Sequence, residues 1–135
     1  AIRSARREGF KVIVVSDGPK VSAQGATKLV RLGRSWGYYG GMAANVGAAM
    51  AETEFITFLD DDDEFVIGAG KIIRAKLRAN PSVDIWAAGV RFDRRNLTDF
   101  YHIKACVSAG YKIDWFGSVI YLVRPSVGGV NGEGK

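Results

Sequence analysis

Residues 60–64 read Asp-Asp-Asp-Asp-Glu and form the densest group of chemically active side chains in the sequence. Like charges a few ångströms apart repel each other and disfavour ionisation, whereas a divalent cation removes that cost. Hard carboxylate oxygens suit Mg²⁺ or Mn²⁺. A plain solvated acidic turn is the alternative. We favour a cation because the block follows an apolar run, residues 55–59, and precedes a helical pattern.

A second candidate carboxylate, Asp17, stands two residues after another apolar run, residues 12–15, in the turn Ser-Asp-Gly-Pro at 16–19. Apolar residues at consecutive positions are typical of strands in a parallel sheet that is covered on both faces. Ligands of such sheets bind beyond the carboxyl ends of the strands. If the two runs are neighbouring parallel strands, Asp17 and the acidic block lie on the same edge and surround one crevice.

The elements that would position these residues alternate along the chain. Apolar runs predict strands at 12–15, 55–59, 83–90 and 119–123, and helical patterns cover 2–8, 41–52 and 69–79. This order indicates an α/β domain with right-handed crossovers. Because the first helical pattern has no strand before it and the chain closes on a glycine-rich run, we expect one partial domain, residues 1–135, of a longer protein.

Composition limits the class of protein. The chain has 135 residues, of which 47% are hydrophobic and 24% charged, as in an ordinary globular domain. Its single cysteine can build neither a disulfide framework nor a multi-cysteine zinc site. No stretch approaches the roughly 20 apolar residues of a membrane-spanning helix, and the first residues lack an apolar signal core. We therefore expect a soluble, cytoplasmic protein.

The charge is unevenly distributed. The net charge is +5 although five of the 14 acidic residues stand together in the block, so the rest of the chain is strongly basic. A basic body indicates an anionic partner: nucleic acid, membrane lipid or a phosphorylated substrate.

Three strings together resemble the nucleotide-binding half of family 2 glycosyltransferases, which have the GT-A fold. They are Val-Val-Ser-Asp-Gly-Pro at 14–19, Asn-Val-Gly at 45–47, and Glu-Phe-Ile-Thr-Phe-Leu-Asp-Asp-Asp-Asp-Glu at 54–64. The resemblance covers most of residues 1–78 and, more loosely, 119–129. It implies a Rossmann-like, mostly parallel sheet flanked by helices, incomplete in this chain.

The resemblance also implies roles for individual residues. In this family an aspartate at the position of Asp17 accepts hydrogen bonds from the base of a nucleotide-sugar donor. The D-x-D motif, here Asp60, Asp61 and Asp62, binds the ribose and an Mg²⁺ or Mn²⁺ ion that bridges the donor diphosphate. Asp62 is the expected direct metal ligand, with Asp60 as the second metal-binding residue. Asn45 matches a donor-binding asparagine of the family.

One expected basic contact to the donor phosphates is missing. The family usually has a basic residue directly before the asparagine, where this chain has Ala44. Arg34 or Lys28 could supply the contact instead. Trp36, in a loop with Tyr38 and Tyr39, could stack on a sugar or base, or equally cap the edge of the sheet.

By the same resemblance, the activity is transfer of a sugar from a UDP- or GDP-sugar to an unidentified acceptor hydroxyl, with inversion at the anomeric carbon. The general base of complete members belongs to an acidic pair that follows a Gly-Gly turn. Glu133 is the only carboxylate near that position, and it fits better as a tail residue, so the base stays unassigned.

Two other functions stay open. The chain could be a non-catalytic fragment that binds nucleotide-sugar and metal without turnover. Acidic clusters also hold the two-metal sites of nucleases and nucleotidyltransferases. The sequence contains no recognisable nucleic-acid-binding motif, so no nucleic-acid partner is expected, whereas peripheral proximity to a membrane is compatible with the basic body.

Overall fold

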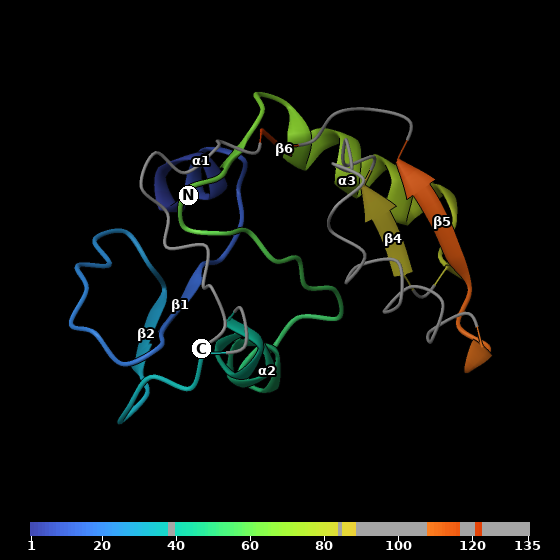
Figure 1. Ribbon diagram of the computed structural model, residues 1–135. Coiled ribbons are helices and arrows are strands. Elements are labelled where there is room, and N and C mark those ends of the chain that lie inside the picture. Colours follow the sequence, from blue (N-terminus) through green and yellow to red (C-terminus); the bar gives the residue numbers. More distant parts are fainter. Residues whose placement is uncertain (38–39, 84, 89–107, 117–120, 123–135) are drawn as a thin grey trace. The chain divides into compact units, whose positions relative to one another are not determined.

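The computed structural model describes residues 1–37, 40–83, 85–88, 108–116 and 121–122 (Figure 1). The described residues fall into two compact units, residues 1–65 and residues 66–122. Both units combine helices with short strands, so the chain is mixed α/β.

A parallel strand pair lies at the centre of the first unit. Strand β1 (Ile13–Ser16) runs beside β2 (Lys28–Arg31), with Ile13 opposite Lys28 and Ser16 opposite Arg31 (Figure 1). The strand predicted at 12–15 is thus confirmed, one residue further along. Strand β2 was not predicted, because Lys-Leu-Val-Arg contains no continuous apolar run.

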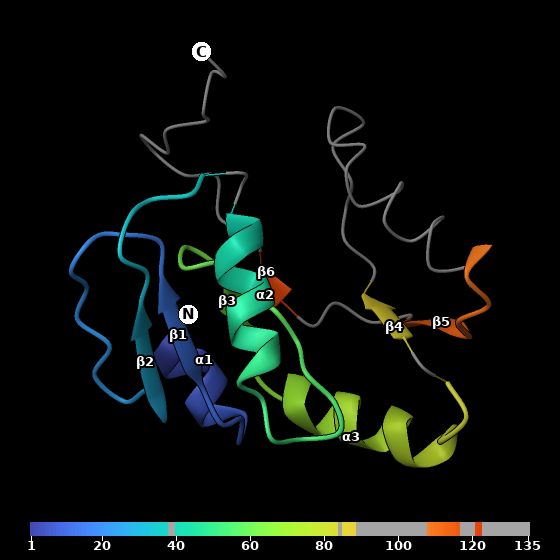
Figure 2. The ribbon, with the colours of Figure 1, turned by 90° about the horizontal axis from the view of Figure 1, so that it is seen from below.

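Helix α2 (Gly41–Ala49) packs against β1 (Figure 2). A Cβ atom added to Gly47 would meet Val15 Cγ2 at 3.5 Å, an ordinary van der Waals contact. Glycine at this position therefore lets the helix backbone lie close to the strand. The helix predicted at 41–52 is confirmed up to Ala49, and Met50 caps it.

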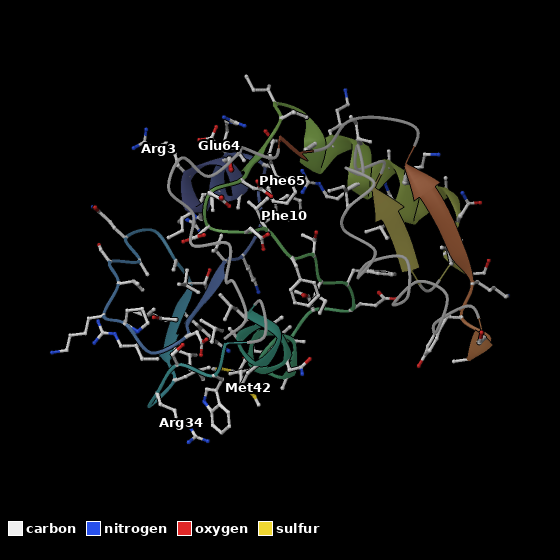
Figure 3. The ribbon with its side chains drawn as sticks, in the orientation of Figure 1. Arg3, Phe10, Arg34, Met42, Glu64 and Phe65 are labelled. Atoms are coloured by element: carbon white, nitrogen blue, oxygen red, sulfur yellow. The ribbon has the colours of Figure 1, made fainter. Side chains whose placement is uncertain are left out.

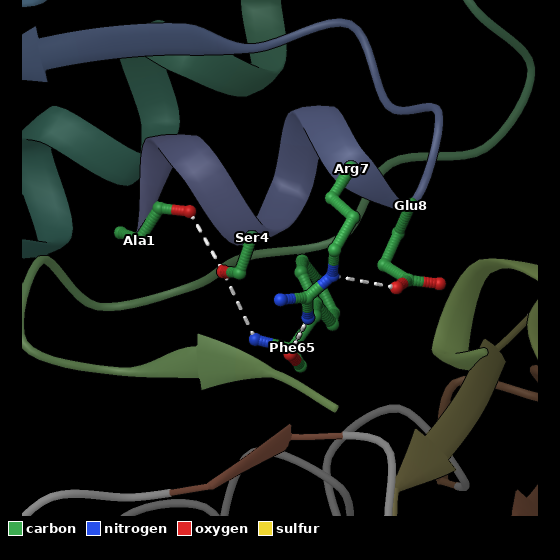
Figure 4. A network of polar contacts seen from close by, with 5 residues as sticks. All are labelled: Ala1, Ser4, Arg7, Glu8 and Phe65. Atoms are coloured by element: carbon green, nitrogen blue, oxygen red, sulfur yellow. Dashed lines mark hydrogen bonds and ion pairs between the residues drawn. The ribbon is translucent and has the colours of Figure 1, made fainter. Parts of the chain in front are cut away.

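Helix α1 (Ile2–Arg7) holds the short strand β3 (Glu64–Phe65) by side-chain contacts to both backbone groups of Phe65 (Figure 4). The N–H of Phe65 donates to Ser4 Oγ at 3.1 Å, and Arg7 Nη2 donates to the Phe65 carbonyl at 2.6 Å. The ring of Phe65 lies 4.9 Å from that of Phe10 between centroids and is buried. The predicted helix at 2–8 is confirmed, with Glu8 as its cap.

The strand predicted at 55–59 is wrong. These residues have no strand conformation, and Ile56 and Phe58 are 48% and 58% exposed. Apolar and β-branched residues favour a strand only where a neighbour completes the hydrogen-bond ladder. Among the described residues β1 has only β2 as its ladder partner, and no strand pairs with 55–59.

The second unit contains helix α3 (Ala69–Ala79), which has the predicted bounds. It follows Gly68, whose φ of 87° lies in the left-handed region, and Asn80 caps its end before Pro81. Strand β4 (Ile85–Ala88) pairs in parallel with β5 (Ile113–Phe116). Strand β4 falls within the predicted strand at 83–90, and β6 (Tyr121–Leu122) within that at 119–123. Strand β5 was missed because Asp114 interrupts its apolar run.

Candidate functional site

Asp17 directly follows β1 and accepts three hydrogen bonds from the loop after β2. Its Oδ1 accepts the backbone N–H of Trp36 at 2.8 Å, and its Oδ2 accepts the backbone N–H of Gly37 at 3.0 Å and the hydroxyl of Ser35 at 3.2 Å. The bond from the Trp36 N–H is the main cause that lowers the pKa of Asp17, and the bonds from Gly37 and Ser35 lower it further. The carboxylate therefore fastens residues 35–37 to the carboxyl end of β1.

The turn after Asp17 needs glycine. Gly18 has a φ of +99°, and a Cβ atom there would lie 2.8 Å from the backbone nitrogen of Ser35. The carbonyl of buried Ser16 accepts the N–H groups of both Gly18 and Leu32, each at 3.0 Å. The turn and the loop after β2 are thus in direct backbone contact, and the Ser-Asp-Gly string predicted as a ligand-binding turn builds that contact.

The same loop carries a stacked cationic and aromatic pair. The guanidinium carbon of Arg34 lies 3.9 Å from the centroid of the Trp36 ring, within range of a cation–π interaction. Trp36 remains 40% exposed although Asp17 anchors its backbone. An exposed indole, a guanidinium and a carboxylate thus gather beyond the carboxyl ends of β1 and β2, where the sequence predicted ligand binding.

Lys28 lies at the other end of the strand pair. It begins β2 opposite Ile13, and its Nζ contacts Glu52 Oε1 at 2.6 Å. This hydrogen bond and the charge of Lys28 lower the pKa of Glu52. Three residues of strand separate Lys28 from Arg31, about 10 Å. Of the two basic residues considered for the missing phosphate contact, only Arg34 lies on the side of Asp17.

Asn45 lies on α2 and is exposed. It stands two positions before Gly47, which faces Val15 of β1. Because residues two apart project from different sides of a helix, Asn45 points away from the strand pair.

The acidic block forms a tight turn. The backbone N–H of Asp63 donates to the carbonyl of Asp60 at 3.1 Å, so that Asp61 and Asp62 occupy the two central positions. Both central residues are exposed, whereas Asp63 is only 5% exposed. In the part of the chain that the structure describes, no three Asp, Glu, His or Cys side chains converge as a metal site.

Contacts place Asp17 and the acidic block, residues 60–64, at opposite ends of β1. Asp17 follows the carboxyl end of the strand, whereas Phe65, directly after the acidic block, packs on Phe10, three residues before the amino end. Figure 3 shows Arg34 at one end of this unit and Phe10 with Phe65 at the other. The single edge expected from the sequence depended on a strand at 55–59, and without that strand the structure does not form it.

Two further groups of candidates lie outside the described residues. These are Glu133, considered for the catalytic base, and the aromatic residues Tyr38 and Tyr39. The sequence pattern did not predict the three-bond attachment of Asp17, since two of its donors are backbone N–H groups.

Comparison of the chain with models of protein families, with curated proteins and with solved structures finds no match. Among the described residues, no helix has the length and apolar character needed to cross a bilayer.

Proposed function

We propose that the chain is the donor-binding part of a glycosyltransferase of the GT-A type, which binds a nucleoside-diphosphate sugar and transfers the sugar to an acceptor hydroxyl with inversion. The observation that carries this proposal is the grouping of Asp17, Arg34 and Trp36 beyond the carboxyl ends of two parallel strands. This is the region where open α/β sheets bind nucleotides.

The chemistry of the group suits a nucleotide. An exposed indole offers a face on which a base can stack, and a guanidinium can pair with phosphate oxygens. A carboxylate has about four lone-pair positions, and Asp17 uses three of them for the loop. One position remains to accept a base N–H without release of the loop.

The acidic turn suits a metal that arrives with its nucleotide. Mg²⁺ is usually held by one or two carboxylates together with substrate phosphates and waters, not by a complete protein cage. Exposed carboxylates at Asp61 and Asp62 fit this type of binding, with Asp62 as ligand, Asp60 as the second metal-binding residue and Asp61 toward the ribose. When bound, Mg²⁺ or Mn²⁺ would neutralise charge on the departing diphosphate.

A donor that contacted both Asp17 and the acidic turn would require the acidic turn to approach the carboxyl end of β1. Residues 55–59 lead into the acidic turn, have no ladder partner among the described residues, and include the exposed Ile56 and Phe58. We propose that donor binding orders this segment. Hydrogen exchange of its amides should then slow when UDP and Mn²⁺ are added together, and not with either alone.

Calorimetry with UDP and with GDP, each with and without Mn²⁺, tests the proposed function. We expect metal-dependent binding of at least one nucleotide, and loss of that metal dependence in Asp62→Ala. Glu54→Ala, which removes an exposed carboxylate upstream of the block, is the matched control and should bind like the wild type. Wild-type affinity in Asp62→Ala would refute the metal assignment, and no nucleotide binding by the wild type would refute the function.

A second assay separates the remaining alternatives. Radiolabelled UDP- and GDP-sugars are incubated with the chain and Mn²⁺, and both transfer and hydrolysis are measured. Donor binding without either reaction identifies a non-catalytic binding fragment. Strongly salt-dependent binding of DNA or RNA, with no nucleotide-sugar binding, identifies the nuclease or nucleotidyltransferase class instead.

A further inference from the structure

Helix α3 presents a basic stripe. Lys71, Arg74 and Arg78 are spaced three and four residues apart, which places them within one narrow arc of the helix, and all three are exposed. Residues 66–83 contain four Lys and Arg and no Asp or Glu. Exposed positive side chains along one side of a helix, such as Lys71 and Arg78 here, indicate an anionic partner surface.

The apolar side of the same helix is used within the protein. Ala69 and Gly70 are buried, and Ile73 and Leu77 on the same side are partly covered. Helix α3 therefore does not offer its apolar face to a partner. The stripe itself is the outward surface, and from Lys71 to Arg78 it spans about 10 Å along the helix.

An exposed isoleucine stands beside the start of this helix. The N–H of Ala69 donates to the carbonyl of Val66 at 3.2 Å, so Ile67 and Gly68 occupy the centre of a tight turn. Ile67 is 84% exposed, the highest value among the large hydrophobic residues that the structure describes as exposed. A branched apolar side chain at the apex of a turn can enter a bilayer without disturbing the fold behind it.

We propose that the stripe of α3 and the turn at Ile67 form a docking surface for a bilayer that contains anionic lipids. Cationic side chains near such a surface each contribute to binding through its negative potential. Transfer of an apolar side chain at the apex of the turn from water to the lipid interior is favourable and strengthens binding. The phosphates of a nucleic acid could pair with the cations, but a nucleic acid offers no apolar interior for the exposed isoleucine. The basic stripe and Ile67 together therefore favour a membrane.

Co-sedimentation of the full chain with phospholipid vesicles tests this proposal. One set contains phosphatidylcholine and phosphatidylglycerol at 3:1, the other phosphatidylcholine alone. We expect binding to the first set only, weakened by added salt. Neutralising Lys71 and Arg78 together, as Lys71→Gln with Arg78→Gln, should weaken binding about thirtyfold, from about fivefold for each charge. Ile67→Ser should weaken it about fivefold or more.

Matched controls keep the test specific. Arg3→Gln with Arg6→Gln removes the same charge from exposed positions on α1, and Ile56→Ser removes an exposed isoleucine from the first unit. Both controls should bind vesicles like the wild type, and circular dichroism verifies that every variant folds.

Four results would overturn the proposal. They are equal binding to both vesicle sets, no binding to either, equal losses in the α3 and α1 variants, and no loss in Ile67→Ser. Wild-type binding to duplex RNA but not to vesicles would also overturn it, in favour of nucleic acid. If a variant failed to fold, the wild-type comparison between the two vesicle sets and between two salt concentrations would still decide.

Discussion

Replacing Ser4 with alanine tests how α1 holds the chain directly after the acidic turn. Ser4 is 3% exposed, its hydroxyl donates to the carbonyl of Ala1 at 2.8 Å, and it accepts the backbone N–H of Phe65 at 3.1 Å. Alanine removes both bonds and leaves the N–H of Phe65 buried without this acceptor. A buried donor that loses its partner costs about 1–3 kcal/mol.

Hydrogen exchange of the Phe65 amide measures this cost locally. A loss of about 1–3 kcal/mol corresponds to exchange faster by about 5- to 150-fold, if the amide exchanges by local opening. With a urea m-value of about 1–3 kcal/mol per molar, the unfolding midpoint should fall by about 1 M. Ser22→Ala, at an exposed position, is the matched control and should change stability by less than about 0.5 kcal/mol. Unchanged exchange at Phe65 in the Ser4 variant would refute the proposed role of α1.

Three further predictions concern the Asp17 end of the first unit. Gly18→Ala should destabilise the protein by about 1–3 kcal/mol in urea unfolding, because φ is +99° and the new Cβ would lie 2.8 Å from a backbone nitrogen of the facing loop. Arg34→Gln should weaken UDP binding in calorimetry, whereas Lys28→Gln, at the opposite end of β2, should not; equal effects would contradict the assignment of Arg34. Because the folded-state pKa of Asp17 is lowered, its attachment to the loop should persist above about pH 4 and be lost as the pH falls through that pKa, seen as a shift of the Trp36 amide resonance; a transition above pH 5 would contradict this.

The sequence predicted the helices and strands whose own residues have a strong conformational preference. The β-branched run at 12–15 and the amphipathic stripe at 69–79 carry their own conformational preference, and both elements form with nearly the expected bounds. Strand β2 has only two apolar residues, Leu29 and Val30, between two charged ones, so its strand character depends on β1 beside it. Residues 55–59 have the composition of a strand, but composition does not supply the neighbour that a strand needs.

The sequence predicted the position of Asp17 after a strand, but it did not predict the contacts around Asp17. Asp17 follows a strand as expected, yet two of its partners are backbone N–H groups about 20 positions away, which any residue type could provide. The packing of Phe65 on Phe10, which ties the acidic turn to the amino end of β1, is equally long-range in the sequence. Hydrophobic periodicity does not predict such long-range contacts. The sequence alone therefore could not show that Asp17 and the acidic block lie apart and not on one edge of a sheet.

Paramagnetic broadening by Mn²⁺ in the ¹⁵N-labelled chain tests most directly whether Asp17 and the acidic turn serve one nucleotide. With UDP present, we predict that Mn²⁺ broadens the amides of Gly18, Trp36 and Asp63 together, and that without UDP it leaves Gly18 and Trp36 sharp. Broadening confined to the acidic turn, and the same with and without UDP, would contradict the proposed donor site and would identify residues 60–64 as a solvated acidic turn.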